Sequence, residues 1–113
     1  MSVDVITQWT TVCPISRIQP ERGVAALVEG TQIALIRTWD DELYAVSNRD
    51  PIAGAQVMSR GIVGTRGDAP TLASPLHKQV YDLRTGECLD VPGVSLPTYR
   101  VRCTDDGLVE VAI

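Results

Sequence analysis

A succession of short apolar segments, separated by tight-turn residues, constrains the fold of this chain more than any other feature. Four segments pair around two turns: 25–28 with 33–37 around Glu29-Gly30, and 99–103 with 108–113 around Asp105-Asp106-Gly107. Apolar runs of this length on both sides of turn residues predict β-hairpins. Within 99–103, apolar and basic residues alternate, as they do in a strand that has one buried face.

The rest of the chain predicts further short strands and almost no helix. A strand is expected at 43–46, after an acidic turn, and shorter strands are expected at 62–63 and 71–73. Residues 15–18 can form one helical turn, but no segment has the length and period of a substantial helix. Many short strands with Gly- and Pro-containing turns predict an all-β sandwich or barrel. The length of 113 residues predicts a single domain over 1–113.

Composition argues against several classes of function. The net charge is −4 and no run of Lys or Arg is present, so we expect no nucleic-acid partner. Phe is absent, so we expect a mostly aliphatic core. The three cysteines, Cys13, Cys88 and Cys103, fit neither a disulfide framework nor a Cys-x-x-Cys metal site. We therefore expect them to be small, buried apolar side chains.

No segment of the sequence predicts contact with a membrane. No stretch approaches the roughly 20 apolar residues that a spanning helix requires. The first 25 residues contain Asp4, Arg17, Glu21 and Arg22 in place of an apolar run of signal length. We therefore expect a cytoplasmic protein with no membrane partner.

Two motifs in the middle of the chain carry most of the functional information. The first reads Asn-Arg-Asp-Pro-Ile at residues 48–52. The second reads Ser-Pro-Leu-His at residues 74–77, and a Tyr-Asp-Leu strand and a Thr-Gly turn follow it. In each motif a Pro comes directly after a short polar residue, which is Asp50 or Ser74. We expect Gly86 to supply the positive φ of the Thr-Gly turn.

The two motifs resemble the ligand loops of a Rieske iron–sulfur domain, which read Asn-x-Cys-Pro-His and Cys-Pro-x-His. The resemblance covers almost the whole chain and implies a Rieske-type β-sandwich with two protruding loops. A Rieske centre needs two thiolates on one iron and two imidazoles on the other. This chain has Asp50, Ile52, Ser74 and His77 at the four ligand positions, so only His77 is retained. The resemblance therefore implies vestigial ligand positions and no cofactor in this chain.

The same positions allow other interpretations. Asp50, Ser74 and His77 could hold a mononuclear Mg²⁺ or Mn²⁺ ion, but Ile52 cannot ligate and no second carboxylate lies at ligand spacing. A Ser74–His77 pair could act as nucleophile and base, but no Gly-x-Ser-x-Gly elbow surrounds it. His77 is either a residual ligand, proton shuttle or interface residue, or an exposed loop imidazole that hydrogen-bonds to the backbone and holds the two loops together.

Basic side chains near the two motifs form a second candidate feature. The predicted partner-docking residues are Arg49, Arg60, Arg66, His77 and Lys78. The arginines and Lys78 are either ordinary solvated side chains or a positive rim that docks on an acidic surface.

The pattern of missing ligands also resembles a particular family, the small subunit of bacterial assimilatory NAD(P)H-dependent nitrite reductase. The resemblance implies a large-subunit partner that carries FAD, the pyridine-nucleotide site, a [4Fe–4S] cluster and siroheme, and a complex that reduces nitrite to ammonia. It assigns no catalytic residue to this chain. Two alternatives remain open: a Rieske ferredoxin that supplies an oxygenase, and a free-standing adaptor or regulator.

Overall fold

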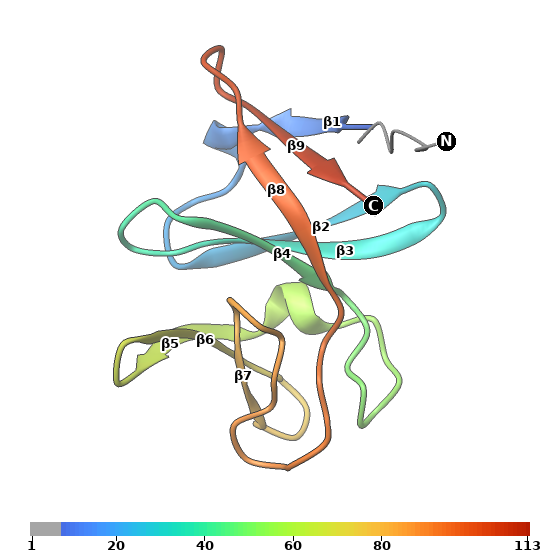
Figure 1. Ribbon diagram of the computed structural model, residues 1–113, viewed down its shortest axis with the longest axis vertical. Coiled ribbons are helices and arrows are strands. Elements are labelled where there is room, and N and C mark those ends of the chain that lie inside the picture. Colours follow the sequence, from blue (N-terminus) through green and yellow to red (C-terminus); the bar gives the residue numbers. More distant parts are fainter. Residues whose placement is uncertain (1–7) are drawn as a thin grey trace, which may run out of the picture.

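Two antiparallel β-sheets form the protein in a computed structural model that describes residues 8–113 (Figure 1). The larger sheet has the strand order β1 (Thr10–Pro14), β9 (Leu108–Ala112), β8 (Thr98–Cys103), β4 (Leu43–Ser47), β3 (Thr31–Arg37) and β2 (Arg22–Val28). The smaller sheet contains β5 (Ile62–Arg66), β6 (Ala69–Ala73) and β7 (Val80–Asp82). Two short 3-10 helices are η1 (Ile15–Arg17) and η2 (Met58–Arg60). The predicted all-β fold is confirmed.

Both predicted hairpins are confirmed. β2 and β3 pair across a two-residue turn, with Val28 opposite Thr31. Glu29 and Gly30 in this turn have φ values of 49° and 80°, and positive φ at both turn residues matches the twist of the flanking strands. β8 and β9 form the second hairpin across the Asp-Asp-Gly turn.

The shorter predicted elements are also present, with longer boundaries. The segments expected at 43–46, 62–63 and 71–73 lie within β4, β5 and β6, and η1 lies within the helical turn expected at 15–18. The sequence did not predict β1. Its pairing with β9 shifts register between Thr11 and Cys13, and such an irregularity interrupts the alternation by which a strand is recognised.

The strand β3 separates two hydrophobic cores. Ile33 and Leu35 point into a core that also contains Val109 and Val111 of β9. The alternate residues of β3 point to the opposite face, where they pack against Val46, Met58, Leu72 and Tyr81. Burial on both faces explains why residues 33–36 are all apolar, since a strand with one solvent face would alternate.

The second of these cores joins the two sheets. It contains side chains from β3, β4, η2, β6 and β7. Figure 1 shows η2 between the larger sheet and the smaller one. Tyr81 is fully buried in this core, so the expected aliphatic core has one large aromatic member.

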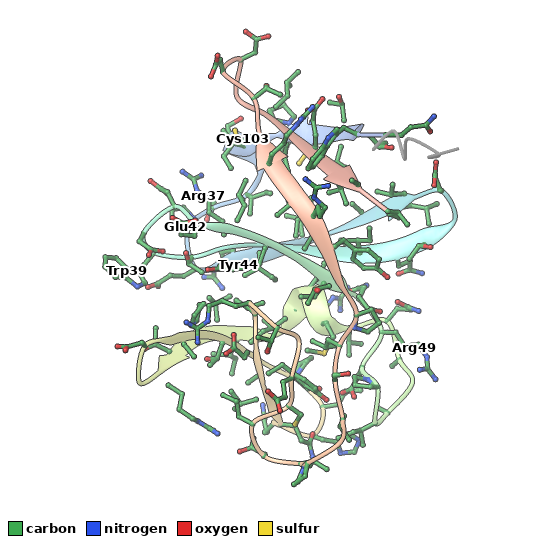
Figure 2. The ribbon with its side chains drawn as sticks, viewed as in Figure 1. Arg37, Trp39, Glu42, Tyr44, Arg49 and Cys103 are labelled. Atoms are coloured by element: carbon green, nitrogen blue, oxygen red, sulfur yellow. The ribbon has the colours of Figure 1, made fainter. Side chains whose placement is uncertain are left out.

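The cysteines only partly follow the prediction. Cys88 is buried and Cys13 is half-buried, but Cys103 is exposed. The prediction for Cys103 is wrong because the end of β8 extends past the core toward the β8–β9 turn (Figure 2).

No helix in the described part of the chain is long and apolar enough to cross a membrane. Asp4 lies outside the described residues.

Two glycines with the same φ of +80° provide a matched test of this packing. A Cβ atom at Gly86 would lie 2.0 Å from the carbonyl oxygen of Leu96, whereas a Cβ atom at Gly30 would meet nothing within 4 Å. Gly30→Ala should cost about 1 kcal/mol in unfolding free energy through its backbone strain alone. Gly86→Ala should cost at least about 2 kcal/mol more, because the backbone must move. Urea unfolding measures both values, and equal losses would contradict the close approach at Gly86.

Candidate functional site

The first loop, residues 48–57, is anchored to the sheet by Asn48. This side chain is buried, and its Oδ1 atom accepts a hydrogen bond of 2.7 Å from the amide of Ser59. Its Nδ2 atom donates to Oε1 of Gln32 over 3.3 Å. The backbone carbonyl of Asn48 accepts from the amide of Met58 over 2.9 Å. These bonds close the base of the loop and fix the direction in which it leaves β4.

Asp50 organises the turn inside this loop. Its side chain is fully buried, and Oδ1 accepts hydrogen bonds from the amides of Ile52 (2.8 Å) and Ala53 (3.1 Å). The amide of Gly54 donates to the Asp50 carbonyl over 2.7 Å, and the amide of Asp50 donates to the carbonyl of Ala55 over 2.8 Å. A short acidic side chain that bonds to amides two and three residues later is typical of a tight turn.

The second loop, residues 74–79, is tied to the first one through Ser74. This side chain is also fully buried, and its hydroxyl donates a short hydrogen bond to Oδ2 of Asp50. The hydroxyl oxygen of Ser74 also accepts a hydrogen bond from the amide of Leu76 over 3.3 Å. The loop closes on itself through bonds of 2.9 Å and 3.0 Å that link the backbone of Ser74 to Gln79 and Lys78. A buried polar contact therefore joins the two loops.

The environment lowers the pKa of Asp50 and raises the pKa of the neighbouring Tyr81. Burial alone would raise the pKa of Asp50, but hydrogen bonds from Ser74, Ala53 and Ile52, together with the nearby His77, lower it overall. Burial, reinforced by the charge of Asp50, raises the pKa of Tyr81 to about 12. The hydroxyl of Tyr81 is buried and has no hydrogen-bond partner among the described residues.

Comparison with known proteins decides the family. The Rieske-like [2Fe-2S] domain family matches residues 8–112. The nitrite reductase (NADH) small subunit of Escherichia coli (strain K12) is 36% identical over 107 residues, which are 94% of this chain and 98% of that protein. The chain belongs to the family of Rieske-like nitrite reductase small subunits. The resemblance seen in the two motifs is therefore confirmed.

Solved structures agree with this membership. A crystal structure from Mycobacterium tuberculosis, of a protein proposed to be an NADH-dependent nitrite reductase small subunit, has a TM-score of 0.92 and 47% identity and covers 96% of this chain and 97% of that chain. The ferredoxin of carbazole 1,9a-dioxygenase from Nocardioides aromaticivorans has a TM-score of 0.79 and 25% identity, with coverage of 94% and 98%. The Rieske-type fold class is confirmed.

One further relative is a large subunit. The nitrite reductase [NAD(P)H] large subunit of Klebsiella oxytoca is 39% identical over 82 residues, which are 73% of this chain and 8% of that protein. A segment similar to this small subunit is thus part of that large-subunit chain.

The residues at the four ligand positions do not fit a Rieske cluster. Ile52 has no donor atom and its side chain is 42% exposed. Asp50 and Ser74 offer oxygen where the cluster needs thiolate sulfur, and they are already hydrogen-bonded to each other. Of the four, only His77 has a suitable donor, and it is exposed. Among residues 8–113, no three His, Cys, Asp or Glu side chains lie close enough together to hold a metal ion.

The structure corrects two interpretations of the second loop. Ser74 donates its hydroxyl to Asp50, so the Ser74–His77 pair that hydrolytic chemistry would need is not formed. Within the described chain, the imidazole of His77 has no hydrogen-bond partner, and the contact that holds the loops together is made by Ser74 and Asp50. The nearby His77 makes a minor contribution to the lowered pKa of Asp50.

The predicted basic rim lies on several different elements. Arg49, His77 and Lys78 are exposed on the two loops. Arg66 is at the end of β5 and forms an ion pair of 3.0 Å with Asp90. Arg60, at the end of η2, lines a separate cleft beside β2. Three of the five predicted docking side chains are therefore carried by the two loops.

A larger cleft lies elsewhere and was not predicted from the sequence. It has a volume of about 570 Å³ and is lined by Glu21, the β3–β4 turn, β4, β5, the β5–β6 turn, Pro70 and Arg84. Figure 2 shows Trp39, Glu42 and Tyr44 gathered at this end of the β3–β4 hairpin, on the other side of the view from Arg49. The sequence signal for this cleft is Trp-Asp-Asp-Glu at residues 39–42, because a turn alone does not require an aromatic residue next to three acidic ones.

The contact between Asp50 and Ser74 predicts a specific pH dependence. Because the pKa of Asp50 is lowered on folding, its ionised form contributes stability that is complete at neutral pH and is lost as the pH falls through the lowered value. Asp50→Asn should therefore cost about 1–3 kcal/mol at pH 7. The difference from wild type should shrink below about pH 4.

Urea unfolding of the wild type and of Asp50→Asn between pH 7 and pH 3 measures this difference. Asp82→Asn is the matched control, since the pKa of Asp82 is also lowered, chiefly by its hydrogen bond with Arg84, but Asp82 lies outside the two loops. A difference between wild type and Asp50→Asn that stays constant with pH would contradict the charged hydrogen bond.

Proposed function

We propose that this chain is the small subunit of an NAD(P)H-dependent nitrite reductase and that it acts by binding the large subunit, without chemistry of its own. One combined observation supports this proposal. The chain is similar to NADH nitrite reductase small subunits over nearly its full length, and the side chains at its four ligand positions do not fit a cluster. A chain that retains this fold without redox ligands is better suited to a role in assembly than to electron transfer.

The large-subunit relative supports the choice of partner. In Klebsiella oxytoca a segment similar to this chain belongs to the nitrite reductase large subunit itself. Domains that are joined in one chain commonly work in one assembly. The same domain on a separate chain would then have to bind the large subunit non-covalently, so the similarity points to that subunit as the partner.

The proposal places the redox groups on the partner. Transfer of electrons from NAD(P)H to nitrite would use FAD, a [4Fe–4S] cluster and siroheme, all on the large subunit. The complex would lie in the cytoplasm. This chain would contribute a rigid surface, because its two loops are fixed by buried hydrogen bonds that need no metal.

The similarity to a dioxygenase ferredoxin suggests a second function, electron transfer to an oxygenase. The side chains at the four ligand positions do not support it. A ferredoxin must carry an electron, and the four ligand positions of this chain offer neither thiolate. The purified chain should accordingly be colourless in visible light, because it lacks the ligands of an iron–sulfur cluster. A purified protein that turns brown after reconstitution with iron and sulfide would favour the ferredoxin function.

Co-expression with the large subunit of the same organism tests the proposed function. The tagged chain should co-purify with a large protein that carries flavin and siroheme absorbance. The complex should reduce nitrite with NADH or NADPH, and the large subunit alone should lose activity or stability. The absence of any such complex would overturn the proposal and favour the adaptor.

The exposed cations of the two loops are the first candidate contact. Arg49→Glu combined with Lys78→Glu should weaken binding of the large subunit by about tenfold, which corresponds to roughly 1.4 kcal/mol, because rim charges attract an oppositely charged surface. The control is Arg17→Glu combined with Arg22→Glu, two exposed cations outside the loops. Biolayer interferometry measures both, and equal affinities would contradict docking through the loops.

A further inference from the structure

The cleft below the β3–β4 turn is acidic. Four carboxylate residues line it: Glu21, Asp40, Glu42 and Asp68. Among residues 8–113, none of them forms an ion pair. Arg84 also lines the cleft, but its guanidinium forms an ion pair of 3.1 Å with the nearly buried Asp82. The cleft therefore presents an excess of negative charge, which Arg84 offsets only in part through its interaction with Asp68.

Aromatic side chains give this cleft a second property. The indole of Trp39 stands at its edge and is 68% exposed, which is unusual for so large an apolar group. Tyr44 lies deeper and is half-buried. Burial raises the pKa of the Tyr44 phenol, and the nearby Glu42 and Asp40 raise it further. Aromatic side chains and carboxylates thus line the same cleft, and Figure 2 shows Trp39, Glu42 and Tyr44 at the same end of the β3–β4 hairpin.

These two properties favour the same kind of ligand. A guanidinium or ammonium group binds over the face of Trp or Tyr through the ring quadrupole. The same cations pair with carboxylates, and arginine does both at once. A volume of about 570 Å³ accommodates several side chains of a peptide. The acidic groups are spread around the cleft and do not converge on one point, so a string of cations fits better than a single ion.

We propose that this cleft binds an extended, Arg- or Lys-rich segment of the nitrite reductase large subunit. The inference rests on the proposed function, and it adds a second contact on a different side of the molecule from Arg49 (Figure 2). The loops offer cations and the cleft offers carboxylates. The two surfaces therefore require opposite charges from the partner, and together they fix the orientation of this chain on the complex.

Charge reversal in the assembled complex is the first test. Glu42 and Asp68 are exposed, and neither side chain donates or accepts a hydrogen bond within the described chain. Glu42→Lys combined with Asp68→Lys should weaken binding of the large subunit about tenfold or more, and the loss should shrink as salt is raised. Asp105→Lys combined with Asp106→Lys is the matched control, because it makes the same change in net charge in the β8–β9 turn.

An isolated peptide gives the second test. An octa-arginine peptide should change the fluorescence of the wild-type chain in a saturable, salt-sensitive way, whereas an octa-glutamate peptide should not. Trp39→Phe should remove this signal while Trp9 still fluoresces. The Glu42→Lys, Asp68→Lys variant should bind octa-arginine more weakly than the Asp105→Lys, Asp106→Lys control.

The outcomes separate the inference from the proposed function. A complex that forms equally well with the cleft variant and with the control would overturn the inference and leave the proposed function intact. A wild-type chain that binds no large subunit would overturn the proposed function and, with it, the partner assigned to the cleft. A wild-type chain without a Trp39-dependent response to octa-arginine would overturn the chemistry of the cleft.

Discussion

Burial of β3 on both faces is the constraint on which the rest of the structure depends. One face packs with β9 in the core of the larger sheet, and the other face packs with the smaller sheet. A shift of its pairing by one residue would exchange the two faces, but every position from 33 to 36 is apolar, so alternation alone cannot set the register. The tight turn at Glu29-Gly30 and the pairing with β4 set it instead. The smaller sheet, which carries the second loop, packs against this strand, and the first loop is tied to it through the hydrogen bond between Asn48 and Gln32.

The hydrogen bond between Asp50 and Ser74 explains how the loops keep their shape without a metal. A buried carboxylate is costly unless hydrogen bonds replace its water. Here one oxygen accepts from two amides and the other accepts from a hydroxyl that itself belongs to the second loop. In a Rieske domain the cluster links these loops through its ligands. In this chain a polar pair at two of the ligand positions makes the link, so the loops form a fixed surface.

Much of the fold followed from local sequence, and the parts that did not have physical reasons. The hairpins were predictable because short apolar segments lie on both sides of residues that favour tight turns. The strand β1 was not predictable, because its irregular pairing disrupts the alternation of apolar and polar residues. The exposure of Cys103 was not predictable either, because it depends on how far β8 extends beyond the core. The vestigial ligand positions were predicted from the resemblance to Rieske ligand loops, but the hydrogen bond that joins two of them is a contact between residues 24 positions apart. The acidic cleft combines residues from four separate segments, so the sequence at residues 39–42 marks only a part of it.

A subunit without a cofactor can influence a reaction only through the surfaces that it presents, and this chain presents two of opposite sign. Its net charge of −4 gives weak long-range attraction to any basic surface, but net charge alone does not orient a small domain. The two proposed contacts, at Arg49 and at the acidic cleft, would orient it, because they lie on different sides of the molecule and call for opposite charges on the partner. Rigid loops strengthen this effect, since a flexible cation would lose side-chain and backbone entropy on docking. Replacement of a cluster by hydrogen bonds is therefore compatible with an orienting role, in which precise placement of the loops is required and an electron carrier is not.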